Sequence, residues 1–121
     1  MEDSIKIISC ISKYDRPMNV DIILKEFKQE LKSLYGERLN NIILYGSYAR
    51  GEATKESDID VMIILKGRVT PGKEIDKMID VITDINLKYE TLISVFPVSD
   101  EDYLNVKSPI LINVRREGIT V

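Results

Sequence analysis

The spacing of apolar residues along the chain predicts two amphipathic helices. The first follows Asn19, a residue type favoured at N-caps, and ends before Gly36. Its apolar residues recur every three or four positions and are Val20, Ile23, Leu24, Phe27, Leu31 and Leu34. The second follows the Pro71-Gly72 break, and its apolar residues are Ile75, Met78, Ile79, Ile82 and Ile85. Charged residues fill the other side of this second helix, which is therefore expected to cover a sheet.

Short continuous apolar runs predict the strands of that sheet. Residues 42–45 and residues 59–65 are bulky and sharply bounded, so each is expected to be a buried strand. The small, polar segment 47–57 between them is too short for a long crossover helix. Residues 91–98 are β-branched and apolar, and Pro97 predicts a strand end or an edge strand there.

Turn and capping residues divide the rest of the chain. Ser99 with Asp102 resembles a capping box for a short helix, and Ser108 before a proline predicts the start of another helix. Residues 119–121 are expected to add a final short strand. Residues 1–18 suit a helix or a strand almost equally, and we favour a short helix.

The order helix, strand, strand, helix, strand, helix predicts an α/β (α+β) protein with a small mixed β-sheet flanked by helices. No repeat, low-complexity segment or long linker divides the chain, so residues 1–121 are expected to form a single domain. The net charge of −3, with acids and bases interspersed, provides no basic stripe for a nucleic-acid groove. No apolar run approaches the roughly 20 residues that a membrane span needs. We therefore expect a soluble protein.

The residue types that are missing restrict the chemistry. The chain has no histidine and a single cysteine, Cys10, so zinc sites of imidazole or thiolate and Ser-His or Cys-His nucleophiles are excluded. Any metal must therefore be bound through oxygen. The lone cysteine and an acidic N-terminus without a secretory signal predict a cytoplasmic location.

Two carboxylates precede and enter the second apolar run. Asp58 and Asp60 are two residues apart, so on a strand both side chains leave the same face, with Cα atoms roughly 6.6 Å apart. An isolated Asp-x-Asp pair usually does no more than open a strand at its solvent edge. Two neighbouring carboxylates also repel each other and resist burial, however, and Mg²⁺ is the natural counter-ion for such oxygen ligands.

A glycine-serine turn ends the first apolar run. Gly46 and Ser47 precede a short helical turn whose N–H groups can contact phosphate oxygens, and Arg50 is close enough to reach the same phosphates. Taken alone, these residues are equally consistent with an ordinary strand-to-helix turn and a solvated arginine. Together with the acid pair, they would hold one nucleoside triphosphate and its metal.

The segment from Gly46 to Ala53, followed by Ser57 to Val61, resembles the minimal nucleotidyltransferase family of the polymerase-β-like superfamily, with its G-S-x10-D-x-D motif. A looser similarity extends over roughly residues 19–121. The resemblance implies a nucleotidyltransferase-like fold in which Gly46 and Ser47 hold the β- and γ-phosphates of ATP. It also implies that Asp58 and Asp60 are catalytic and bind two Mg²⁺ ions, which flank an in-line displacement at the α-phosphorus.

The resemblance is incomplete at one position. Catalytic members of the superfamily usually carry a third carboxylate on a neighbouring strand, and alternation along residues 91–96 puts Ser94 at that position. Serine is a poor substitute. Glu90 lies on the matching face and is the alternative third acid if the register differs; otherwise it is a solvated carboxylate at a helix end.

Two functional hypotheses follow from the resemblance. In the first, the chain transfers AMP, or another nucleotidyl group, to a hydroxyl group on a partner protein or small molecule. Minimal nucleotidyltransferases are often antitoxins that modify a tyrosine of a separate helical HEPN-type ribonuclease. In the second, a non-catalytic module of the same fold binds nucleotide or sequesters the partner. The acidic balance disfavours a third hypothesis, a nucleic-acid polymerase. The sequence leaves open the nucleotide preference, the acceptor and the formation of homo-oligomers.

Overall fold

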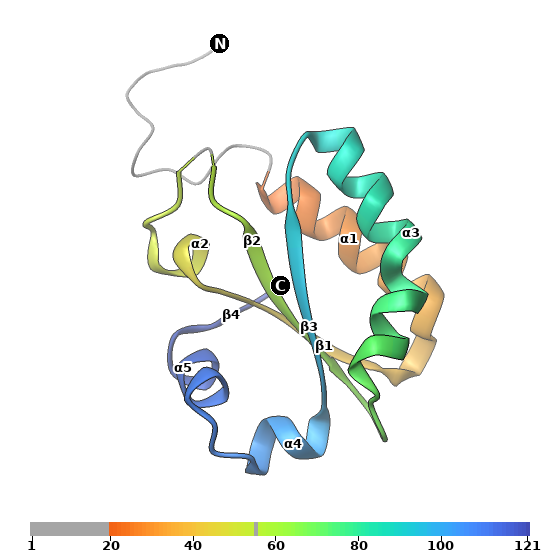
Figure 1. The fold of residues 1–121 in the computed structure, drawn as a ribbon, viewed down its shortest axis with the longest axis vertical. Helices are drawn as coiled ribbons and strands as arrows, with labels where there is room; N and C mark the ends of the chain where they lie inside the picture. Colours follow the sequence, from red (N-terminus) through yellow and green to blue (C-terminus); the bar gives the residue numbers. More distant parts are fainter. Residues whose placement is uncertain (1–19, 55) are drawn as a thin grey trace.

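The computed structural model describes residues 20–54 and 56–121. Its helices are α1 (Val20–Tyr35), α2 (Ser47–Arg50), α3 (Pro71–Tyr89), α4 (Asp100–Asn105) and α5 (Pro109–Glu117), with a 3-10 turn, η2 (Gly36–Arg38). Its strands are β1 (Leu39–Tyr45), β2 (Ile59–Leu65), β3 (Ile93–Ser99) and β4 (Ile119–Thr120) (Figure 1). The helix predicted within residues 1–18 and the predicted N-cap Asn19 lie outside the described residues.

The strands of the described chain form one mixed sheet in the order β3-β2-β1-β4. β1 runs antiparallel to both β2 and β4, whereas β2 and β3 are parallel and are connected through α3. Pro97 lies in β3, which is an edge strand, as predicted. The predicted fold class, a small mixed sheet flanked by helices, is confirmed.

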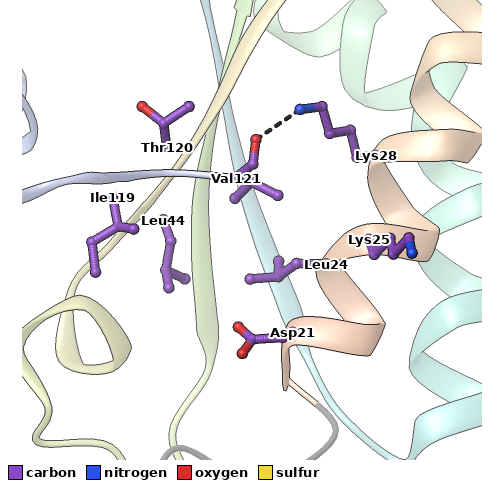
Figure 2. Close-up of a pocket in the computed structure, with 8 residues that line it drawn as sticks. All are labelled: Asp21, Leu24, Lys25, Lys28, Leu44, Ile119, Thr120 and Val121. Atoms are coloured by element: carbon purple, nitrogen blue, oxygen red, sulfur yellow. Dashed lines mark hydrogen bonds between the residues drawn. The ribbon is translucent and has the colours of Figure 1, made fainter.

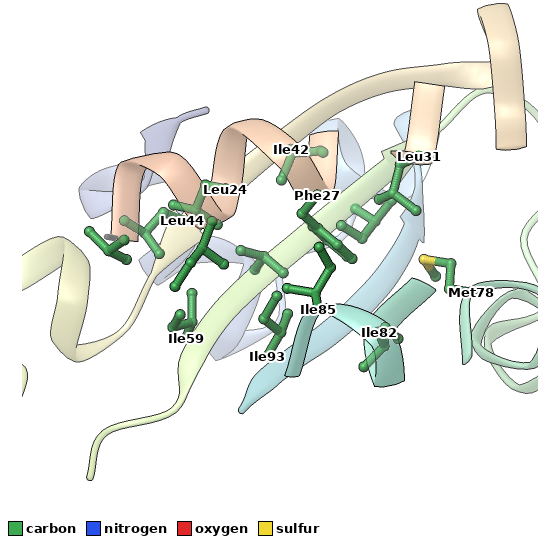
Figure 3. Close-up of a cluster of buried hydrophobic side chains, with 14 of the residues drawn as sticks. Leu24, Phe27, Leu31, Ile42, Leu44, Ile59, Met78, Ile82, Ile85 and Ile93 are labelled. Atoms are coloured by element: carbon green, nitrogen blue, oxygen red, sulfur yellow. The ribbon is translucent and has the colours of Figure 1, made fainter. Parts of the chain in front are cut away.

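Alternation along the strands divides the core into two layers. Side chains such as Leu44 and Ile63 face α1 and α3, which lie on one side of the sheet (Figure 1, Figure 3). Side chains at the alternate strand positions, such as Ile43 and Met62, pack against residues of α5 on the opposite side of the sheet. Each fully buried side chain of this kind stabilises the fold by about 1.5–3 kcal/mol. β2 is buried on both faces over most of its length, which explains its nearly continuous apolar sequence.

Three predicted helix boundaries are confirmed by the conformation and hydrogen bonds of their end residues. The start of α3 is corrected, because Pro71 and Gly72 form its first turn and not a break before it. Gly36, which follows α1, has a φ of 58°, the left-handed conformation that favours glycine at a helix end. The Ser99 hydroxyl accepts a hydrogen bond from the N–H of Asp102 at 3.0 Å, and the Ser108 hydroxyl accepts one from the N–H of Leu111 at 3.3 Å. Both serines are therefore N-caps.

Some expectations need correction. β1 begins at Leu39, earlier than predicted, and β3 begins later. Leu34 and Ile79 belong to the predicted apolar stripes but are 43% and 47% exposed, because the buried side of each helix is narrower than its stripe. Glu74 is buried although charged residues of α3 were expected to face solvent; Arg38 donates a hydrogen bond to its carboxylate at 3.0 Å. No helix in residues 20–54 and 56–121 has the length and apolar character of a membrane span.

Candidate functional site

Side chains from three neighbouring strands lie side by side near one end of the sheet. Asp60 pairs with Tyr45 of β1 and with Ser94 of β3. Because paired residues project from the same face of a sheet, Asp60 lies between Tyr45 and Ser94. Asp58 precedes β2 and is close enough to Asp60 to interact with it electrostatically. Ile59 packs into the core with α1 and α3, so Asp60 projects from the opposite face of the sheet.

Gly46 brings the two sequence motifs into contact. It connects β1 to α2 with a φ of 76° and a ψ of −152°, a conformation that favours glycine. A Cβ atom added at this position would lie 2.4 Å from Oδ2 of Asp60, closer than the 3.0 Å below which real Cβ contacts essentially never fall. The Asp60 carboxylate therefore occupies space that only glycine leaves open. The glycine-serine turn and the acid pair form one site.

The short helix α2 presents its first turn to this site. It begins at Ser47, directly after Gly46, and Tyr48 anchors it in the core beneath α1. The N–H of Arg50 donates to the carbonyl of Gly46 at 3.1 Å, and Gly51 ends the helix with a φ of 74°. The first N–H groups of a helix have no partner within it. The turn at Ser47 can therefore donate hydrogen bonds to an anion such as a phosphate oxygen.

The surroundings of Asp60 disfavour a negative charge without a counter-ion. Burial raises the pKa of its carboxyl group, the nearby Asp58 carboxylate raises this pKa further, and Arg50 lowers it. Burial and the charge of Asp60 also raise the pKa of the Tyr45 phenol. Among the residues that the structure describes, no group donates a hydrogen bond to the Asp60 carboxylate. Its oxygens are therefore available to a cation.

Arg50 lies at the edge of the site, but its guanidinium is bound to other groups. Its Nε contacts Oε1 of Glu52 at 3.0 Å, and its Nη1 contacts Oε1 of Glu117 at 3.2 Å. The Arg50 side chain is 43% exposed, and ion pairs at the surface are weak because water and salt screen them. The guanidinium carries five N–H donors, so Arg50 retains donors for a phosphate oxygen, and either surface pair could open to let it turn toward one.

Within residues 20–54 and 56–121, no third carboxylate joins the pair. The β2 and β3 register places Ser94 beside Asp60, whereas Glu90 ends α3 with a left-handed φ of 52°. No group of three or more His, Cys, Asp or Glu side chains within the described ranges could hold a metal. The donor set for a cation is therefore Asp58 and Asp60. This set fits Mg²⁺, which proteins commonly bind through one or two carboxylates together with substrate phosphates and water.

Tyr45 is the neighbour of the acids that sequence reasoning missed. The apolar run at residues 42–45 predicts only that Tyr45 belongs to a buried strand. In the structure it is half-buried beside Asp60. Its position directly before Gly46 could have identified Tyr45 as a neighbour of the acids, because the end of one strand in an antiparallel pair faces the start of the next.

A separate cavity of about 390 Å³ lies between α1 and the edge of the sheet at β4 (Figure 2). Its lining residues are Asp21, Leu24, Lys25, Lys28, Leu44, Ile119, Thr120 and Val121. Lys28 donates a hydrogen bond to the carbonyl of Val121 at 2.8 Å across this space. Neither the acid pair nor the glycine-serine turn contributes to the lining, so this cavity is distinct from the candidate site.

Comparisons with known proteins match most of the chain. A family model described as "Nucleotidyltransferase domain" matches residues 24–113. The chain is similar to "Putative protein adenylyltransferase MJ0604" of Methanocaldococcus jannaschii, with 45% identity over 84 residues, which are 69% of this chain and 78% of the relative.

Solved structures share the fold. A "putative nucleotidyltransferase" from Sulfolobus solfataricus superposes with a TM-score of 0.60 at 19% identity, over 82% of this chain and 76% of that one. A structure described as a toxin-antitoxin with AMP-PNP superposes with a TM-score of 0.54 at 18% identity, over 79% and 70% of the two chains. At these identities the likeness establishes the fold alone.

Proposed function

Because the chain belongs to the nucleotidyltransferase domain family, as the sequence resemblance implied, we propose that it is a magnesium-dependent adenylyltransferase. It transfers AMP from ATP to a hydroxyl group on a partner protein and releases pyrophosphate. The partner is a separate helical protein of the HEPN type, for which this chain acts as the antitoxin. The observation that carries the proposal is the contact between Gly46 and the Asp60 carboxylate, beside Asp58.

In this proposal the glycine-serine turn binds the triphosphate. Gly46 allows the backbone to approach the β- and γ-phosphates, and the first N–H groups of α2 and the Ser47 hydroxyl donate hydrogen bonds to them. Arg50 contributes a further phosphate contact by exchanging one of its surface carboxylate partners for a phosphate oxygen.

Asp58 and Asp60 supply the carboxylate oxygens that hold magnesium. When bound there, magnesium would supply positive charge next to the phosphoryl oxygens. The chain itself contributes positioning: the Asp60 carboxylate rests against Gly46, which fixes the acid pair relative to the phosphate turn. Metal dependence is typical of the nucleotidyltransferase family.

The names of similar proteins support the nucleotide and the acceptor. The relative from M. jannaschii is named a protein adenylyltransferase, which supports AMP as the transferred group and a protein as its acceptor. The toxin-antitoxin structure with AMP-PNP supports an adenine nucleotide and a toxin partner.

A labelling experiment tests the proposal. The tagged chain is isolated from its native cells with its co-purifying proteins and incubated with Mg²⁺ and ATP labelled at either the α- or the γ-phosphate. We expect a co-purifying protein to become labelled from the α-phosphate only. Asp60→Asn should abolish this labelling, whereas Asp80→Asn, the same change at an exposed position of α3, should not. Labelling from the γ-phosphate, or labelling that survives in Asp60→Asn, would overturn the proposal.

The serine beside Asp60 favours a second candidate function. A site with two carboxylates can still bind Mg·ATP, so the same fold could serve as a non-catalytic nucleotide-binding module that sequesters its partner. In the labelling experiment, such a module would retain the partner and bind the nucleotide but leave no label on any protein.

A further inference from the structure

Ser94 lies beside Asp60 at an exposed position where a longer, metal-binding side chain could be accommodated. Its strand, β3, is an edge strand, and its side chain is exposed, whereas Ile93 is buried on the other face. Adjacent strands are about 4.8 Å apart, so an acidic side chain at position 94 would reach the space that the Asp60 carboxylate faces. On its other side, Asp60 is flanked by Tyr45, which is also uncharged at neutral pH.

The number of carboxylates limits the number of cations. Two divalent ions about 3.5–4 Å apart form a clamp around a displacement at phosphorus and need carboxylates that bridge or flank them. A single Mg²⁺ is satisfied by one or two carboxylates, completed by phosphate and water oxygens. Asp58 and Asp60 together balance the charge of one divalent ion. A second ion at this site would face a neutral hydroxyl at Ser94 where it needs a carboxylate.

We propose that Ser94 restricts the site to one divalent cation per bound nucleotide and that an acid at this position admits a second. The inference rests on the proposed function, because it concerns the same metal-bound triphosphate. It departs from the two-metal arrangement that the family resemblance implies. Position 94, which is exposed, thus sets the metal content of the site.

Metal counting tests the inference without measuring catalysis. The complete chain is dialysed to equilibrium against Mn²⁺ and α,β-methylene-ATP, which cannot be cleaved at the α-phosphorus, and the bound manganese is counted per bound nucleotide. We expect one Mn²⁺ for the unmodified chain and for Ser94→Asn, and two for Ser94→Asp. The two ions in Ser94→Asp should also broaden each other's electron paramagnetic resonance signals. Circular dichroism verifies folding, and Ser94→Glu replaces Ser94→Asp if that variant does not fold.

The outcomes separate the inference from the proposed function. Two manganese ions in the unmodified chain, or a single ion in the folded acidic variants, would overturn the inference and leave the proposed function standing. If no variant binds manganese or nucleotide, the proposed function fails and the inference fails with it.

Discussion

Replacing Gly46 by alanine tests whether the glycine-serine turn and the acid pair act as one site. The added Cβ would lie 2.4 Å from Oδ2 of Asp60, so the carboxylate must move by about 1 Å to restore an ordinary contact. Because an error of about 1 Å in placing a reacting group can cost about 100-fold in rate, and nucleotide binding depends on the same carboxylate, we expect a loss of affinity for Mn·α,β-methylene-ATP of at least about tenfold. The alanine would also adopt a φ of 76° with a ψ of −152°, a region that essentially only glycine populates, which costs about 1–3 kcal/mol.

Gly51→Ala is the matched control for this substitution. Gly51 has a φ of 74°, close to the 76° of Gly46, but a Cβ atom there would meet nothing within 4 Å. Gly51 is left-handed helical, with a ψ of 21°, so Gly51→Ala should lose about 1–2 kcal/mol of unfolding free energy, measured by urea denaturation. Gly46, with a ψ of −152°, lies in a region that essentially only glycine adopts, so Gly46→Ala should lose at least as much, about 1–3 kcal/mol. Only Gly46→Ala should lose nucleotide affinity, measured by calorimetry. Equal affinities for the two variants would refute the contact between the turn and Asp60 as the basis of the site.

Three further predictions concern stability, each measured by urea denaturation. Glu74→Gln should cost roughly 1–3 kcal/mol at pH 7, less than a fully buried pair, because Arg38 is 29% exposed. Burial raises the pKa of Glu74, but hydrogen bonds, first from Arg38, lower this pKa below 4.5 on balance. The stabilisation by the Glu74 carboxylate is therefore present above pH 4.5. The difference in unfolding free energy between Glu74→Gln and the native chain should shrink as the pH falls below 4.5. Gly118→Ala places a Cβ 2.4 Å from Cγ2 of Ile43 and should cost about 1–3 kcal/mol. Ser108→Ala removes the N-cap of α5 and should cost about 1 kcal/mol. Unchanged stability in any of these variants would contradict the contact concerned.

Local patterns predicted most of the architecture because they depend on neighbouring residues. Helical spacing fixed α1 and α3, and capping serines located the starts of α4 and α5. The exposure of Leu34 could not be predicted, because it depends on how far the sheet extends beneath α1. The burial of Glu74 could not be predicted either, because its hydrogen-bond partner Arg38 lies 36 residues away in the sequence.

The candidate site shows the same division between local and distant information. The sequence shows the residue types and the spacing of the site residues, and these predicted which side chains form it: Gly46, Ser47, Asp58 and Asp60. Their distances depend on the pairing of Tyr45 with Asp60, which no local pattern specifies. The surface ion pairs of Arg50 likewise required the structure, since Glu117 comes from a distant helix.

If Asp58, Asp60 and the Gly46 turn together hold a metal-bound triphosphate, nucleotide binding depends on both the metal and the acids. Calorimetric titration of the chain with α,β-methylene-ATP, with and without Mg²⁺, measures this dependence. We expect saturable binding that requires Mg²⁺, that Asp80→Asn retains and that Asp60→Asn loses. Binding of equal strength in Asp60→Asn, or binding indifferent to Mg²⁺, would show that the acids and the turn do not form a nucleotide site.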